Sequence, residues 1–221
     1  MDDIRAIILD RMQALAPALD EAMSAAITQT ETRAAGFAHE RFPHTRPMNV
    51  RQDVRLAREA MPNLAGWKVE GDPRKMGQLI LEDSQTGISI RFLKSPYSQP
   101  DGIPHAGSNH ARRLKWTNPR FEAPLPGMGL SSRLTSLEAL AGTPFLLIWA
   151  YLDPAKRDAG YDLRIIHTLA PGRFGGATPC DLDLRIPRGG ILREEDLRFV
   201  ASENDEDLFV FDLPAEEEDQ A

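Results

Sequence analysis

The stretch FLLIWAYL, residues 145–152, decides the fold of this 221-residue chain. Its eight apolar residues stand between Pro144 and Asp153-Pro154, and they are too few for a membrane span, which needs roughly 18–20 such residues. The run is rich in aromatic and branched side chains, which is typical of a strand buried on both faces. Residues 161–169 follow after a polar loop, so we expect them to form a second strand beside the first.

Further strand-like patterns lie on both sides of this pair, at residues 67–71, 78–82, 88–93, 181–186 and 208–211. The first three are separated by short turn-like segments and predict a three-stranded meander. In residues 88–93, apolar side chains alternate with Ser89 and Arg91, which indicates a half-buried antiparallel strand. Residues 181–186 alternate in the same way and predict that Asp181, Asp183 and Arg185 share one face.

Helical periodicity dominates the N-terminal region. In residues 3–35, apolar side chains recur every three or four positions, so one face of the helix must be covered. Pro17 predicts two helices or one bent helix. The stripe is expected to pack on the chain's own sheet, and a homodimer through these helices is the alternative. A second helix is expected over residues 50–61, capped by Asn49, and a third over residues 132–141.

These patterns predict an α+β fold: an N-terminal helical arm, then a mainly antiparallel sheet of six to eight strands with one or two packed helices. We expect the arm to span residues 1–62, the antiparallel α+β domain residues 63–213, and an acidic tail residues 214–221.

The composition is that of a globular protein of a reducing compartment. The chain starts with an acidic segment where a secretory signal would be basic, and its one cysteine, Cys180, permits no internal disulfide. We therefore expect a cytoplasmic protein without a membrane anchor. Arginine supplies 21 of the 26 basic residues, a bias that suggests a bacterial or phage origin.

The net charge of −7 is distributed unevenly along the chain. Residues 41–120 carry a net charge of +7, whereas the segments before and after them are acidic. Such an asymmetry indicates an anionic partner for the middle segment, or two halves of one domain that neutralise each other.

The most basic part of the middle segment reads IPHAGSNHARRLKWTNPR, residues 103–120. A short helix beginning at Ser108 or Asn109 would present free backbone amides to a phosphate, and the arginines would add bidentate donors. Aromatic residues between basic groups are used by single-strand binders for base stacking. The candidate anion-binding residues are Ser108, Asn109, His110, Arg112, Arg113, Lys115 and Trp116. The alternative is a basic loop over the acidic half of the chain, with the tryptophan as a core anchor.

Carboxylates on the late strands form a second candidate site. Asp162, Asp181 and Asp183, with Arg185, resemble the arrangement in which strand carboxylates of a nuclease hold a divalent metal. Such enzymes usually place a lysine two residues after the second carboxylate, whereas arginine stands here and cannot act as a base. Alternation on the wet face of a strand produces the same pattern without any metal.

The remaining polar residues carry no recognised motif. The histidines His39, His44, His105, His110 and His167 lack the spacing of a zincin, and the glycines of residues 171–178 fit neither a Walker loop nor a dinucleotide fingerprint. We therefore expect no cofactor and no metal. In the buried strand of residues 161–169, His167 is expected to be a hydrogen-bonded partner.

Three functions remain open from the sequence. The first is a cytoplasmic binding or regulatory protein, not an enzyme, whose basic middle segment contacts an anionic partner such as nucleic acid. The second is a metal-dependent hydrolase or nuclease that uses the strand carboxylates. The third is a protein that binds a partner through its acidic C-terminal region, residues 203–207 and 216–219.

Overall fold

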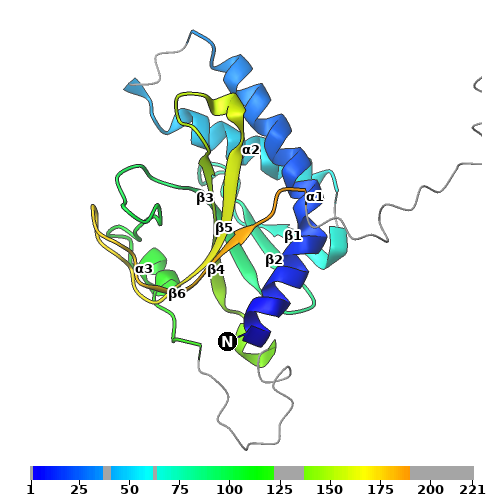
Figure 1. The fold of residues 1–221 in the computed structure, drawn as a ribbon, viewed down its shortest axis with the longest axis vertical. Helices are drawn as coiled ribbons and strands as arrows, with labels where there is room; N and C mark the ends of the chain where they lie inside the picture. The colour runs from blue at the N-terminus through cyan, green and yellow to red at the C-terminus, as the bar shows by residue number, and fades with distance from the viewer. Residues whose placement is uncertain (1, 37–40, 62–63, 122–136, 190–221) are drawn as a thin grey trace, which may run out of the picture. The chain divides into compact units, whose positions relative to one another are not determined.

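The fold is a six-stranded sheet with helices on both faces. The structure is a computed structural model, and it describes residues 2–36, 41–61, 64–121 and 137–189. The strands are β1 (Trp67–Glu70), β2 (Ile80–Asp83), β3 (Ser89–Lys94), β4 (Pro144–Tyr151), β5 (Tyr161–Thr168) and β6 (Cys180–Ile186). They lie side by side in chain order (Figure 1). The predicted α+β class is confirmed, and the strand candidate at residues 208–211 lies outside the described residues.

All neighbouring strands are antiparallel except one pair. β3 and β4 run parallel, with Ile90 opposite Phe145 and Phe92 opposite Leu147. A parallel pair needs a long connection that crosses from one end of the sheet to the other. Residues 95–143 supply it, and they carry α3 (His110–Trp116). The predicted central strand is confirmed, since β4 is buried at nearly every position on both faces.

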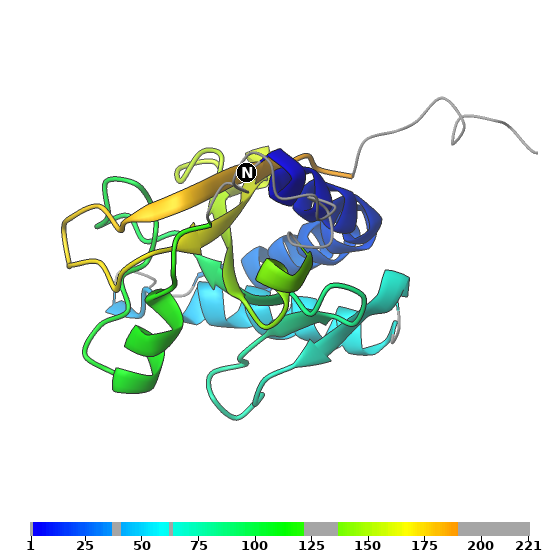
Figure 2. The same cartoon turned by 90° about the horizontal axis from the view of Figure 1, so that it is seen from below.

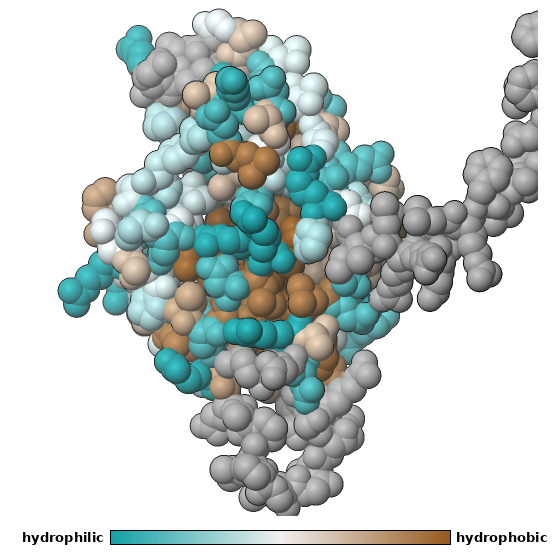
Figure 3. All heavy atoms as spheres, in the orientation of Figure 1, coloured by the Kyte–Doolittle hydropathy of each residue, from teal (hydrophilic) through white to brown (hydrophobic). Residues whose placement is uncertain are grey.

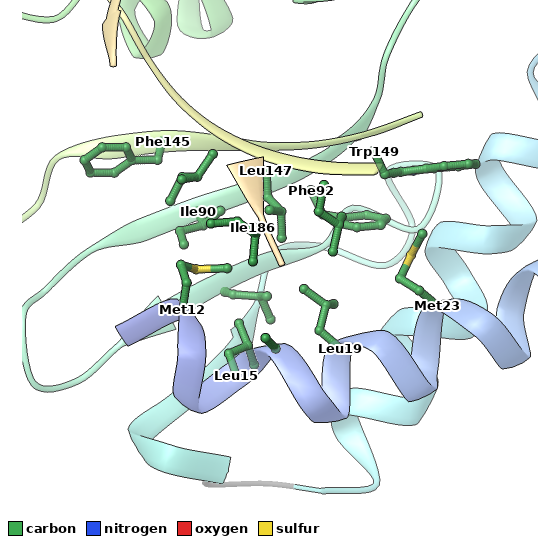
Figure 4. Packing of buried hydrophobic residues seen from close by; sticks show 14 of the residues in the cluster. Met12, Leu15, Leu19, Met23, Ile90, Phe92, Phe145, Leu147, Trp149 and Ile186 are labelled. Carbon is green, nitrogen blue, oxygen red and sulfur yellow. The ribbon is translucent and has the colours of Figure 1, made fainter. Parts of the chain in front are cut away.

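Helix α1 (Asp2–Arg33) covers one face of the sheet. Its buried stripe includes Met12, Leu15, Leu19 and Met23, which pack against side chains of the strands (Figure 4). The apolar stripe of α1 therefore packs on the chain's own sheet, as expected. The helix continues through Pro17, so of the two predicted alternatives, two helices or one bent helix, the division into two is wrong. Proline removes one backbone hydrogen bond, and the packing on both sides of it holds the helix together.

Helix α2 (Thr45–Glu59) packs beside α1 and begins earlier than predicted. Asn49 lies inside the helix, and His44 takes the N-cap position without a side-chain bond. Pro47 fits inside this helix because it lies in the first turn, where backbone amides have no partner within the helix.

The other face of the sheet is covered by α3 and the loops beside it. Trp116, Ile103 and Ala106 pack there on Leu146 and Ile148 of β4, forming a smaller core. Figure 2 shows α1 and α3 on opposite sides of strands β4–β6. Of the helix predicted over residues 132–141, residues 137–140 are helical, and the earlier residues lie outside the described part.

Short elements complete the fold: the 3-10 turns η2 (Leu64–Gly66) and η3 (Arg157–Ala159). Between α1 and β6 lies a hollow of about 210 Å³, lined mainly by apolar side chains such as Leu9, Met12 and Ile186. On the face drawn in Figure 3, hydrophobic residues gather near the centre and hydrophilic residues surround them.

Candidate anion-binding site

A basic pocket lies where β3 extends beyond β2. The register of β2 with β3 ends at Ile80, opposite Arg91, so the last residues of β3 continue past the end of the neighbouring strand. The first turns of α2, the β1–β2 loop and α3 contribute the surrounding walls. The pocket is therefore built by segments that are far apart in the sequence.

The hollow has a volume of about 580 Å³, within the range of small-molecule sites. Its lining contains no aspartate or glutamate among the described residues. Seven of its lining residues are lysine or arginine: Arg46, Arg51, Lys75, Arg91, Lys94, Arg112 and Arg157. A concave surface that gathers one sign of charge focuses its electric field on whatever enters.

Three of these arginines form a group of mutually repelling charges. Burial, followed by repulsion from Arg112 and Arg51, lowers the pKa of Arg91 to about 10. Burial and Arg112 also lower the pKa of Arg51. Arg51 donates from Nε to the Met76 carbonyl at 3.0 Å. Within the described part of the chain, none of the three arginines pairs with a carboxylate.

Lys94 lies at the edge of the same pocket, surrounded by aromatic rings. Its Nζ is 3.9 Å from the centroid of the Tyr97 ring, 5.6 Å from that of Trp149 and 5.7 Å from that of Tyr151. It donates to the Ser95 carbonyl at 3.1 Å. Burial, followed by repulsion from Arg157, lowers the pKa of Lys94 to about 8. The ammonium is thus held where an added negative charge would raise that pKa.

One carboxylate, Glu31 of α1, balances part of the charge. It lies 3.1 Å from Arg46 and 3.7 Å from Arg157, and it accepts a hydrogen bond from the Tyr151 hydroxyl at 3.2 Å. Burial and this carboxylate raise the pKa of Tyr151, so the phenol stays protonated. Arg46 and Arg157 are therefore partly neutralised, in contrast to the three-arginine group.

Of the predicted anion-binding residues, only Arg112 reaches this pocket. Asn109 caps α3, as one of the two predictions had it, and accepts from the Arg112 amide at 2.9 Å. Ser108 and His110 are exposed beside it, Arg113 points back to the Gly107 carbonyl, and Lys115 contributes to a much smaller hollow. These residues do not converge on one point.

Trp116 is a core anchor. It is 1% exposed, and its indole N–H donates to the Pro104 carbonyl at 2.8 Å. The predicted stacking on a base needs an open ring face, and burial removes it. Burial in the small core is the alternative that the sequence left open.

The strand carboxylates are each engaged by a different side chain. Asp183 pairs with Arg164 at 2.9 Å, and Asp162 pairs with Arg185. Asp181 lies 2.6 Å from Nδ1 of His167 and accepts from the Phe121 amide at 3.0 Å. The register of β5 with β6 shifts at Asp181, which is left without a partner residue between Cys180 and Leu182, and its side chain is buried. Asp181 therefore does not share the exposed face of Asp183 and Arg185.

No group of three histidine, cysteine, aspartate or glutamate side chains in the described ranges is arranged to hold a metal ion. His167 is buried and hydrogen-bonded, as expected. His105 accepts from the Gly107 amide, His44 lines the basic pocket, and His39 lies outside the described residues.

The basic pocket was missed in the sequence because its residues follow no motif. The signal that pointed towards it was the charge excess of residues 41–120, which contain six of the seven pocket cations. Arg51 and Arg91 are 40 positions apart, so only folding brings them together.

Comparisons with known proteins identify no relative. No family model matches the chain, and neither a curated protein nor a solved structure matches it. Among the described helices, none combines the length and the apolar composition that a membrane span requires.

Proposed function

We propose that this chain is a binding protein whose basic pocket holds an anionic partner. The observation that supports the proposal is the group of Arg51, Arg91 and Arg112, which gathers three charges beside one another without a carboxylate in the described structure. Like charges in a partly buried place destabilise the folded state, and a bound anion relieves that repulsion.

Phosphate is the anion that this group fits best. Guanidinium groups bind phosphate oxygens through two parallel hydrogen bonds, and they remain charged even when burial lowers their pKa. Nucleic acid is therefore the first partner to test. Because the whole chain has a net charge of −7, binding is expected to depend on the local pocket and not on general attraction.

The two other functions have less support. The carboxylates of the hydrolase hypothesis are each held by a separate partner, namely Arg164, Arg185 or His167. The acidic segments of the protein-partner hypothesis, residues 203–207 and 216–219, lie outside the described residues. We propose no reaction for the basic pocket.

The test is fluorescence anisotropy of the purified full chain with labelled single- and double-stranded DNA and RNA at roughly 50 and 200 mM salt. We expect binding that weakens at the higher salt. Arg112→Gln should lower the affinity and reduce the salt slope by about 1. Arg113→Gln is the matched control, because this neighbour on α3 is exposed and points away from the pocket.

Equal effects of the two substitutions would place the contacts along α3 instead of in the pocket. If no labelled strand binds at the lower salt, nucleic acid is not the partner. The pocket assignment itself fails if neither nucleic acids nor small phosphates bind.

A further inference from the structure

The shape of the basic pocket restricts the kind of anion that it accepts. Its cations come from α2, the β1–β2 loop, β3, α3 and the η3 region, so they face the hollow from several sides. A protein that tracks a nucleic-acid backbone uses a groove along which basic groups are spaced. Cations that converge on one hollow of about 580 Å³ suit a compact ligand.

The charge of the pocket indicates a ligand with several negative charges close together. Arg51, Arg91 and Arg112 each affect the charge state of another member of the group, so they lie within electrostatic reach of one another. A single monoanion would leave most of this repulsion in place. Adjacent phosphates of a di- or triphosphate match three neighbouring guanidinium groups in charge and in hydrogen-bonding capacity.

An aromatic side chain, Tyr97, lies beside the cations and could bind the base of such a ligand. Tyr97 lines the pocket and is 70% exposed, so its ring is accessible to a ligand there. The loop of Ser95, Pro96 and Tyr97 also lines a neighbouring hollow of about 450 Å³, so the ring lies between two open spaces. An exposed ring beside cations is a platform on which a planar base stacks.

We infer that the pocket binds a nucleoside polyphosphate group, with the phosphates on the three arginines and the base against Tyr97. The inference rests on the proposed function, because it names the class of anion for the same pocket. Two kinds of ligand carry a nucleoside polyphosphate group: a free nucleotide, and the 5′-triphosphate end of an RNA strand.

Isothermal titration of the full chain in the presence of a chelator tests the inference. The probes are ATP, GTP, AMP, tripolyphosphate and inorganic phosphate, together with a ten-nucleotide RNA carrying either a 5′-triphosphate or a 5′-hydroxyl. We expect the triphosphates to bind at least about tenfold more tightly than AMP, since each additional charge-assisted contact contributes on that scale. A nucleoside triphosphate should also exceed tripolyphosphate.

Two substitutions separate the two halves of the site. Tyr97→Ser should remove the advantage of the nucleoside triphosphate over tripolyphosphate, while Arg91→Gln should weaken both. Phe174→Ser is the matched control for the aromatic change, because Phe174 is 76% exposed and does not line the pocket. Circular dichroism of each variant checks that the fold is retained.

The outcomes are distinct. Tight binding of free nucleotides identifies a small-molecule ligand, and binding of only the 5′-triphosphate RNA identifies a strand end; either supports the inference. If RNA with a 5′-hydroxyl binds as tightly as RNA with a 5′-triphosphate and nucleotides do not bind, the inference is wrong and the proposed function stands. If no probe binds, both are wrong.

Discussion

Arg58 is the residue whose replacement should stabilise the protein. Its side chain lies near the end of α2 and is 1% exposed. In the described part of the chain, Nε, Nη1 and Nη2 of Arg58 have no hydrogen-bond partner. Burial lowers the pKa of this guanidinium, which shows that the protein disfavours its charge. A buried polar group without a partner costs about 1–3 kcal/mol, and a charged group costs more.

Arg58→Met removes the guanidinium and keeps a long apolar side chain at the site. We expect the free energy of unfolding to rise by about 1–3 kcal/mol. The melting temperature should rise by roughly 2–4 °C for each kcal/mol in a chain of this size. Urea unfolding followed by tryptophan fluorescence measures the change, because the tryptophans Trp67, Trp116 and Trp149 are buried and report on the core.

Arg55→Met is the control on the same helix. The Arg55 guanidinium donates to the carbonyls of Glu70, Gly71 and Gln78, which join α2 to the β1–β2 hairpin. Its replacement removes these three partly buried hydrogen bonds and should lower stability by about 2–3 kcal/mol. If Arg58→Met lowers stability as much as Arg55→Met does, the reasoning about the unpaired guanidinium is refuted.

Three further predictions concern ionisable groups. Asp83 accepts hydrogen bonds from Arg11 at 2.8 and 2.9 Å. Burial by itself would raise the pKa of the carboxyl, but the hydrogen bonds from Arg11, Thr86 and the Gln85 amide, together with the charge of Arg11, hold it below its ordinary value. Asp83→Asn should therefore lose about 3–5 kcal/mol at pH 7 in urea unfolding. The loss should shrink below about pH 4, because a carboxyl with a lowered pKa loses its stabilising effect as the pH falls through that value; a constant loss down to pH 3 would contradict the ion pair. The pKa of Lys94 is about 8, so its ammonium loses its charge as the pH rises from 7 to 9.5, and anion affinity measured by titration should fall over that range. The affinities of the parent and of Lys94→Gln should differ least at pH 9.5. Parallel pH profiles of the two proteins would exclude a role for this ammonium. Burial, followed by the nearby carboxylates with Asp183 foremost, raises the pKa of the Cys180 thiol. Iodoacetamide should therefore alkylate Cys180 more slowly at pH 8 than it alkylates free cysteine. An equal rate would disprove the raised pKa.

The sheet could be predicted largely because its strands carry strong local patterns. β4 is apolar at consecutive positions, which predicts burial on both faces. In β6 apolar and polar residues alternate, which predicts burial on one face. The parallel direction of β3 and β4 could not be predicted, because it depends on the route of residues 95–143, where the sequence has little periodicity. The bulge at Asp181 of β6, which brings this residue to His167, is likewise a property of the pairing with β5, and the β6 sequence alone does not predict it.

The basic pocket could not be predicted from the sequence, because its residues form no motif. The excess of basic residues in the middle segment was visible, but their grouping depends on the packing of α2, β3 and α3. The position of Trp116 next to basic residues suggested that it stacks on a base. In the structure its ring is buried in the core, and its indole N–H donates to a backbone carbonyl. Tyr97 stands alone in a proline-rich loop, and no spacing marks it as part of a site.

The packing of α1 has a consequence for the newly made chain. The helix is translated before all the strands that cover it, and its apolar stripe is buried against strands that end at Ile186. Its Asp20 also binds Tyr161 and Arg188, from the last part of the described chain. At roughly 5–20 residues per second, the ribosome needs about 8–30 s to make the segment between them. During this interval the apolar stripe of α1 has no native partner, so a chaperone that binds nascent chains should recognise it.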